Sequence, residues 1–313
     1  MIESIKNIDF LSSVLVGIVS AIFAILIFTM FRRWFLDKVL PIAHNIAIIG
    51  FEKAGKTTLI TTIFKEIFAD KILGIKAIPK GQNSISIINE NIATLERGNS
   101  LKPTTDQAMR SYTINMTKGS LLRKKTYKVQ LADFPGKKSK KFADENIKSI
   151  INTEFFNWAI GADAFIFVID LARYLDDPVS SREYVANLSK EIRIAWQHIL
   201  NYHEDKKEKI LHKPLIILFT KADLFHLSKK PTEDHKTIEE IKKKGFGEKI
   251  PDEIKLSKTT IDEAAKNAKN DFSDLINYLK KDQVKSKVLF VSSFGYINRE
   301  KLNLSELINS ILP

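Results

Sequence analysis

The stretch NIAIIGFEKAGKTTLITTIFKEIF, residues 45–68, decides the fold. A short apolar run is followed by G-x-x-x-x-G-K-T and then by apolar residues at helical spacing, which predicts a strand, a turn and a helix. Glycines let backbone N–H groups of such a turn point inward, and the start of the helix adds partial positive charge. The turn is therefore suited to phosphate, with Gly50, Glu52, Lys53, Ala54, Gly55, Lys56, Thr57 and Thr58 as its binding residues.

Two side chains of this turn have specific predicted roles. Lys56 supplies a point charge to the terminal phosphates of a nucleotide, and the Thr57 hydroxyl is placed to bind Mg²⁺. The alternative is a chance match in an ordinary strand–turn–helix. The eight-residue pattern is selective and stands between a strand-like and a helix-like segment, which favours the phosphate site.

An uncharged apolar run, FLSSVLVGIVSAIFAILIFTMF, occupies residues 10–31. As a helix it is long enough to cross the hydrocarbon core of a bilayer, and two arginines and a tryptophan follow at once. A cleaved signal peptide or a buried core helix are the alternatives. Glu3 and Asp9 before the run disfavour a signal peptide. The basic residues after the run predict an outside N-terminus and a cytoplasmic remainder.

The composition excludes some classes of function. The chain has 313 residues, 44% of them hydrophobic, and a net charge of +12. It has no cysteine, so disulfides, thiolate catalysis and Cys-based metal sites are excluded. Excess lysine suits phosphate, anionic lipid or simple solubility. Nucleic-acid binding is not expected, because the lysine-rich segments lack interleaved aromatic residues for base stacking.

Four further short motifs follow the phosphate turn along the chain. LKPTTD (101–106) places a threonine pair before a strand-like segment, and LADFPG (131–136) ends a strand with D-x-x-G. FTKAD (219–223) and VSSF (291–294) close two more apolar runs. Each alone is common turn or strand-end chemistry. Together and in this order, they resemble the Ras-like, translation-factor-related P-loop GTPases over roughly residues 45–313.

The resemblance implies roles for the first two motifs. A switch I threonine binds Mg²⁺ and the γ-phosphate, and both Thr104 and Thr105 remain candidates. Asp133 holds the metal through water, and the Gly136 N–H meets the γ-phosphate. The implied catalytic set is Lys56, Thr105 and Gly136, and the implied metal set is Thr57, Thr104, Thr105 and Asp133.

The resemblance also implies GTP or GDP as the nucleotide, with Mg²⁺. Thr220, Lys221 and Asp223 stand where the family reads guanine: the Asp223 carboxylate accepts from two guanine donors that adenine does not present, and Lys221 packs along the base. Thr220 replaces an Asn, as in dynamin-like members. The family's last motif is represented by Ser292, Ser293 and Phe294. An N-terminal span before a Ras-like domain is also similar to the signal-recognition-particle receptor β subunit.

The expected fold class is α/β, with a mostly parallel six-stranded sheet covered by helices on both faces. A hairpin at 109–133 is expected to form one antiparallel edge. The predicted organisation is a short N-terminal segment (1–9), a transmembrane helix (10–31), a juxtamembrane linker (32–43) and a GTPase domain (44–313). Helical insertions are expected at about 70–103 and 225–287, the second as a docking surface for a protein partner.

Lys137 follows Gly136, where many switches have a Gln or His that orients water. Lysine has donors but no acceptor, so it cannot orient water as an amide does. One hypothesis is a slow, Mg²⁺-dependent GTPase switch in which a residue elsewhere in the chain, a partner or a second protomer positions the water. The alternative is a membrane receptor that holds GTP with little turnover.

Overall fold

The structure is a computed structural model and describes eleven segments of the chain. They are residues 15–32, 41–50, 53–101, 110–119, 125–133, 158–175, 178–206, 210–225, 254–281, 285–297 and 300–313.

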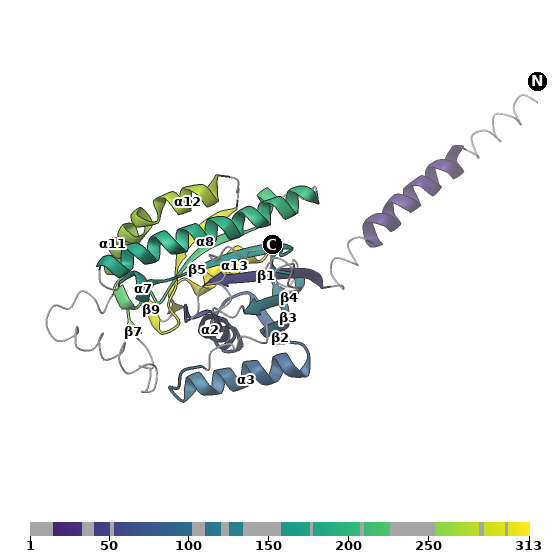
Figure 1. The fold of residues 1–313 in the computed structure, drawn as a ribbon. Coiled ribbons are helices and arrows are strands. Elements are labelled where there is room, and N and C mark those ends of the chain that lie inside the picture. Colours follow the sequence, from purple (N-terminus) through teal and green to yellow (C-terminus); the bar gives the residue numbers. More distant parts are fainter. Residues whose placement is uncertain are drawn as a thin grey trace, which may run out of the picture.

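An apolar helix, Leu15–Arg32, precedes the folded domain (Figure 1). Its mean hydropathy is 2.3, and none of it is buried inside the structure. Length and composition allow this helix to cross a membrane. It could be a membrane anchor or a signal sequence, and its lack of burial is unlike that of a soluble core helix.

The main sheet has seven strands in the order β2-β3-β4-β1-β5-β6-β8. The strands are β1 Ile42–Gly50, β2 Ile75–Pro79, β3 Arg110–Lys118, β4 Lys125–Asp133, β5 Ala164–Asp170, β6 Leu215–Thr220 and β8 Ser286–Phe290. Pairing is parallel from β4 through β1, β5 and β6 to β8, and antiparallel between β2 and β3 and between β3 and β4. The expected mostly parallel α/β sheet is confirmed, but the count of six strands is wrong.

The additional strand is β2, which lies in the first insertion. This insertion, 70–103, was expected to be helical and instead contains β2 followed by helix α3, Gln82–Glu96. β2 pairs along the outside of β3, so the 109–133 hairpin is not the sheet edge. Ile75 points into the core and is only 2% exposed, while its neighbour Lys76 is exposed. Burial on one face only is what stabilises so short an edge strand.

Helices cover both faces of the sheet, as expected. They are α2 Lys56–Phe68, α3, α7 Leu171–Tyr174, α8 Pro178–Asp205, α11 Lys258–Asp271, α12 Ser273–Lys280 and α13 Leu304–Ile311, with a 3-10 turn at Ile210–His212. α8, α11 and α12 lie over one face, and α2 and α3 lie on the opposite side (Figure 1). Side chains of α13 pack in the same core cluster as those of α2.

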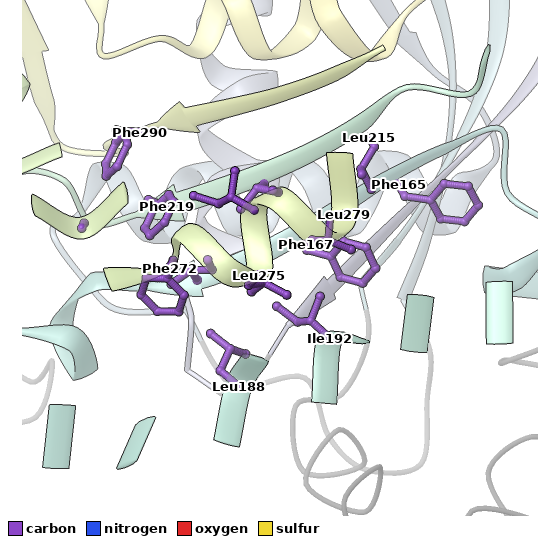
Figure 2. Packing of buried hydrophobic residues seen from close by; sticks show 14 of the residues in the cluster. Phe165, Phe167, Leu188, Ile192, Leu215, Phe219, Phe272, Leu275, Leu279 and Phe290 are labelled. Atoms are coloured by element: carbon purple, nitrogen blue, oxygen red, sulfur yellow. The ribbon is translucent and has the colours of Figure 1, made fainter. Parts of the chain in front are cut away.

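The central strands are buried on both faces because their side chains alternate between two cores. In β5, Phe165 and Phe167 join the core beneath α8, while Ile166 and Val168 join the core beneath α2. The α8 side is rich in aromatic rings (Figure 2), with Trp196 edge-on to Phe165 at a centroid distance of 5.8 Å. Such pairs contribute about 0.5–1.5 kcal/mol beyond area burial.

A second, small sheet has the order β10-β9-β7. Its strands are β7 Ile254–Lys255, β9 Gly295–Ile297 and β10 Glu300–Lys301. β7, α11 and α12 form the part of the second insertion that the structure describes. A Cβ on Gly295 would lie 2.5 Å from the Leu256 side chain, so the strands meet closely only because this residue is glycine.

Candidate nucleotide-binding site

The predicted phosphate turn lies between β1 and α2, as expected. Gly55 adopts the left-handed region (φ 80°) immediately before the first residue of α2. This conformation is easy for glycine and unfavourable for most other residues. Lys53 is also left-handed, with φ 66°. Phe51 and Glu52 lie outside the described residues.

Gly50 ends β1 and pairs in register with Val168 of β5. A Cβ on Gly50 would lie 2.8 Å from Val168 Cβ and 3.0 Å from the Val168 carbonyl oxygen. Real Cβ atoms essentially never approach other atoms so closely, and one of the two contacts is with backbone that cannot rotate away. The glycine therefore sets the strand spacing from which the phosphate turn departs.

The Lys56 ammonium is folded back over the turn. It donates to the Gly50 carbonyl oxygen at 2.9 Å, and the residue is 5% exposed. A buried positive charge requires polar partners. This places a cation inside the turn, at the carboxyl end of β1, where the sequence predicts the terminal phosphates. Thr57 and Thr58, both partly buried, follow in the first turn of α2.

The third motif is held against the phosphate turn by two side chains. The Thr220 hydroxyl, at the end of β6, lies 2.8 Å from the Ala54 carbonyl oxygen. The Lys221 ammonium donates to the Lys53 carbonyl oxygen at 2.9 Å. Residues more than 160 positions apart in sequence are thus joined directly. The sequence placed Thr220 and Lys221 at the site but did not predict these contacts.

Asp223 and Ser292 bring the third and fourth motifs together. The Ser292 hydroxyl donates a short hydrogen bond to Asp223 Oδ1, and both side chains are buried. Ser292 Oγ in turn accepts from the backbone N–H groups of Phe294, at 3.1 Å, and Gly295, at 2.6 Å. Burial raises the pKa of Asp223 above its usual range, and the Ser292 hydrogen bond opposes this shift. Additional donors to this carboxylate would favour its charged form.

Asp170 is a site residue that the sequence analysis missed. It is the last residue of β5, is 2% exposed, and its Oδ2 accepts from the Lys221 ammonium at 2.9 Å. Its Oδ1 accepts from the Ala172 N–H at 2.9 Å and so caps α7. The available signal was a single acid closing the buried run FIFVID at the edge of the sheet that also carries Gly50 and Thr220.

The structure describes only some of the remaining predicted site residues. Thr104, Thr105 and Gly136 lie outside the described residues, as do Lys137–Lys141. The backbone of Asp133 ends β4 and pairs in register with Ile48 of β1, one strand away from the phosphate turn. Among the described residues, no group of three or more His, Asp or Glu side chains could by itself hold a metal ion.

The described motifs converge at the carboxyl ends of β1, β5, β6 and β8, where parallel α/β sheets bind ligands. A sequence model of the Double-GTPase 2 family matches residues 44–279. The chain belongs to the Double-GTPase 2 family. Its membership supports GTP binding.

Solved structures with similar folds are remote from this Double-GTPase 2 member. One is a bacterial selenocysteine-specific elongation factor (16% identity, TM-score 0.36), for which the match covers 87% of this chain and 28% of that chain. A signal recognition particle receptor SRb-GTP/SRX complex from Chaetomium thermophilum matches with 15% identity and a TM-score of 0.39. This match covers 82% of this chain and 93% of that chain. The Arl6 BBS3 small GTPase of Trypanosoma brucei matches with 12% identity and a TM-score of 0.34. This match covers 80% of this chain and 87% of that chain. The search of curated proteins found no match.

Proposed function

We propose that this chain is a GTPase held at a membrane by its N-terminal apolar helix, with its nucleotide domain in the cytoplasm. It binds GTP with Mg²⁺, hydrolyses GTP to GDP and phosphate, and in the GTP form recruits a protein partner at the membrane. The observation that carries the proposal is the junction of the two nucleotide loops. Lys221 and Thr220 of the base-reading motif bond directly to Lys53 and Ala54 of the phosphate turn.

The base end of the site favours guanine in this proposal. The buried Asp223 carboxylate accepts a hydrogen bond from Ser292 and has capacity for further donors. Guanine offers two adjacent N–H donors to a carboxylate, whereas adenine does not present this pair. Because burial raises the pKa of Asp223, a base that donates two hydrogen bonds to the charged form is strongly preferred over one that donates none.

The phosphate end supplies positive charge for an in-line attack of water on the γ-phosphate. The Lys56 ammonium and the N–H groups of the turn stabilise charge that develops on phosphate oxygens. The Thr57 hydroxyl and the Asp133 carboxylate offer the oxygen ligands that Mg²⁺ prefers, Thr57 directly and Asp133 through water. When bound, the metal neutralises phosphate charge during the attack.

A second candidate function is a GTP-holding membrane receptor with little turnover. It is favoured by Lys137, which stands where a water-orienting Gln or His is usual in this class. Phosphate release by the full chain in lipid nanodiscs separates the two candidates. Tight GTP retention with release no faster than in buffer would support the receptor, whereas release that depends on the protein would support the GTPase.

Lys56→Ala tests the phosphate turn. The variant should bind GTP roughly 10- to 100-fold more weakly, since a hydrogen bond to a charged group contributes about 1.5–3 kcal/mol. Lys287→Ala is the matched control, because Lys287 forms an exposed ion pair with Glu306 at the far end of β8 and such pairs contribute little. Unchanged GTP retention by Lys56→Ala would refute the nucleotide site.

Asp223→Asn tests the base assignment. The amide retains an acceptor for the Ser292 hydroxyl, but it offers guanine an N–H where the carboxylate offered an acceptor. GTP affinity should fall roughly 10- to 100-fold, by the same hydrogen-bond argument, and xanthosine triphosphate should bind better than GTP. A variant that retains full GTP affinity would show that Asp223 does not read the base.

A further inference from the structure

The edge of the main sheet opposite the nucleotide loops carries exposed lysines and an exposed leucine. β1, β4, β5, β6 and β8 run parallel, so all five strands begin at this edge. β3 ends there beside the start of β4, and β2 begins there beside the end of β3. We call this edge the strand-start face and define it by Leu73, Lys125, Lys206, Lys281 and Lys285.

The strand-start face also lies at the end of the domain where the chain arrives from the N-terminal apolar helix. Ile42 is the first residue of β1, and Arg32 is the last described residue of the N-terminal apolar helix. The intervening chain can span at most roughly 35 Å, even fully extended. In Figure 1 the apolar helix lies on the side of the domain where β1 begins. If that helix crosses a bilayer, the strand-start face lies within reach of the lipid surface.

Three of the four lysines that define this face form no ion pair among the described residues. Lys125, Lys281 and Lys285 are exposed, and none forms an ion pair with another residue in the part of the chain that the structure describes. The Leu215 N–H donates to the Lys285 carbonyl oxygen at 3.0 Å, which fixes Lys285 at the start of β6. Lys206 follows the last residue of α8 and is exposed as well, and its ammonium contacts the Tyr202 hydroxyl and lies 4.3 Å from the centroid of the Tyr202 ring.

The described residues near this face also include four acids, Asp70, Asp163, Glu204 and Asp205. In the sequence, Asp282 stands between Lys281 and Lys285. Asp163 is already engaged, with Lys213 at 3.9 Å and with the Asn45 N–H at 2.9 Å. Arg32 ends the apolar helix, and Arg33, Asp37 and Lys38 stand between it and β1, so this stretch of the sequence is net basic.

Leu73 adds an apolar group to the face. It is 85% exposed, the highest value among the large hydrophobic side chains of the described residues. It follows α2, and its neighbour Gly74 accepts at 3.1 Å from the Gly119 N–H of the turn after β3. A face that carries both lysines and an exposed leucine matches the boundary of an anionic bilayer, where the ammonium groups meet headgroups and the apolar side chain enters the outer acyl region.

We infer that the strand-start face docks on anionic lipid headgroups of the bilayer that holds the N-terminal helix. This inference rests on the membrane anchor of the proposed function. Docking orients the domain so that its nucleotide edge, one strand length away, points into the aqueous phase. In this inference the charge of the face sets the orientation of the domain on an anionic bilayer.

The absence of cysteine gives a direct test with the full chain. Leu73→Cys and Val179→Cys each introduce one thiol for an environment-sensitive fluorophore. Val179 is the matched control: it is apolar, 76% exposed, and lies at the start of α8, near the nucleotide edge. Each labelled chain is reconstituted in phosphatidylcholine vesicles with or without phosphatidylserine, and quenching by acyl-chain spin-labelled lipid is measured.

The label at position 73 should be quenched at least about twofold more in the vesicles that contain phosphatidylserine, since the attraction depends on lipid charge. The label at position 179 should be quenched weakly and equally in both. Changing Lys125, Lys281 and Lys285 together to Glu should abolish the difference at position 73. Retained GTP binding by this triple variant checks that its fold is intact.

Equal quenching at position 73 in both lipid mixtures, or equal quenching at positions 73 and 179, would overturn the inference. Alkaline carbonate extraction separates this failure from failure of the proposed function. A chain that is extracted from the vesicles lacks the anchor, and both proposals then fail. A chain that stays inserted but shows no lipid-dependent quenching overturns the docking face alone.

Discussion

Removing the charge of Asp170 tests whether the base-reading loop is fixed to the rest of the sheet by an ion pair. Asp170 is 2% exposed, and its carboxylate makes two contacts: Oδ2 with the Lys221 ammonium and Oδ1 with the Ala172 N–H, both at 2.9 Å. Asp170→Asn keeps an oxygen for Ala172 and removes the charge that faces Lys221. Asp170→Ala removes both contacts.

The expected magnitudes follow from these two contacts. Breaking a fully buried pair costs about 3–5 kcal/mol, but the Lys221 side chain is 22% exposed and keeps its bond to the Lys53 carbonyl oxygen. We therefore expect the ion pair to contribute about 1–3 kcal/mol to the free energy of unfolding, and the helix cap to contribute about 1 kcal/mol. Asp170→Asn should lower the free energy of unfolding by the amount given for the ion pair, and Asp170→Ala should lower it by the sum of both amounts.

Thermal and denaturant unfolding of the full chain in nanodiscs measures the effect. At roughly 2–4 °C per kcal/mol, Asp170→Asn should lower Tm by roughly 2–12 °C. Lys221→Met and the double variant complete a cycle, in which the coupling between Asp170 and Lys221 should be about 1–2 kcal/mol. The reasoning would be refuted if the free energy of unfolding of Asp170→Asn lay within about 0.5 kcal/mol of the parent value, which is the range of ordinary surface substitutions.

Two further predictions concern the ends of β1. Gly50→Ala should destabilise the fold by at least about 2 kcal/mol in denaturant unfolding, because its Cβ would clash with Val168 of β5; stability equal to the parent would contradict the close approach. At the other end, the buried His44 ring has a pKa lowered chiefly by burial, and its Nε2–H donates to the Ile311 carbonyl oxygen at 2.7 Å. The unfolded chain therefore binds the extra proton first as the pH falls below about 6.5, so the stability due to His44 is present above that pH and is lost below it. Thermal unfolding on both sides of that pH should show a smaller loss on acidification for His44→Gln than for the parent, and equal losses would contradict the prediction.

The sequence predicted those parts of the site that are contiguous in the chain. The phosphate turn could be recognised because its glycines, Lys56 and helix start all lie within one short stretch, and local backbone chemistry determines its shape. Asp223 could be assigned to this edge of the sheet for a related reason: it follows a fully buried strand, β6, whose end meets the same edge.

Other features depend on contacts between distant segments. Asp170 pairs in register with Thr220, and only the β5–β6 alignment brings the Asp170 carboxylate to Lys221. No spacing in the chain encodes that alignment. The hydrogen bond from Ser292 to Asp223 likewise joins residues 69 positions apart, so two motifs read separately prove to be one buried pair.

The missed strand β2 has a different cause. Its five residues, Ile75–Pro79, are near the lower limit of strand length, and their pattern is short enough to fit a helical insertion as well. What decides between the two is the free edge of β3, which offers backbone partners to an extended segment. This pairing depends on the assembled sheet, so it cannot be read from the sequence of residues 75–79 alone.

The contacts at the site bear on whether the protein is a switch or a receptor. Thr220 and Lys221 attach the loop after β6 to the turn after β1, and Asp170 attaches that loop to β5, so the two loops proposed to meet the nucleotide are already fixed relative to one another. Less ordering on binding raises affinity for any guanine nucleotide, with or without a γ-phosphate. High affinity for GTP and GDP alike is therefore expected of both candidate functions. Turnover, and not affinity, is the measurement that decides between them.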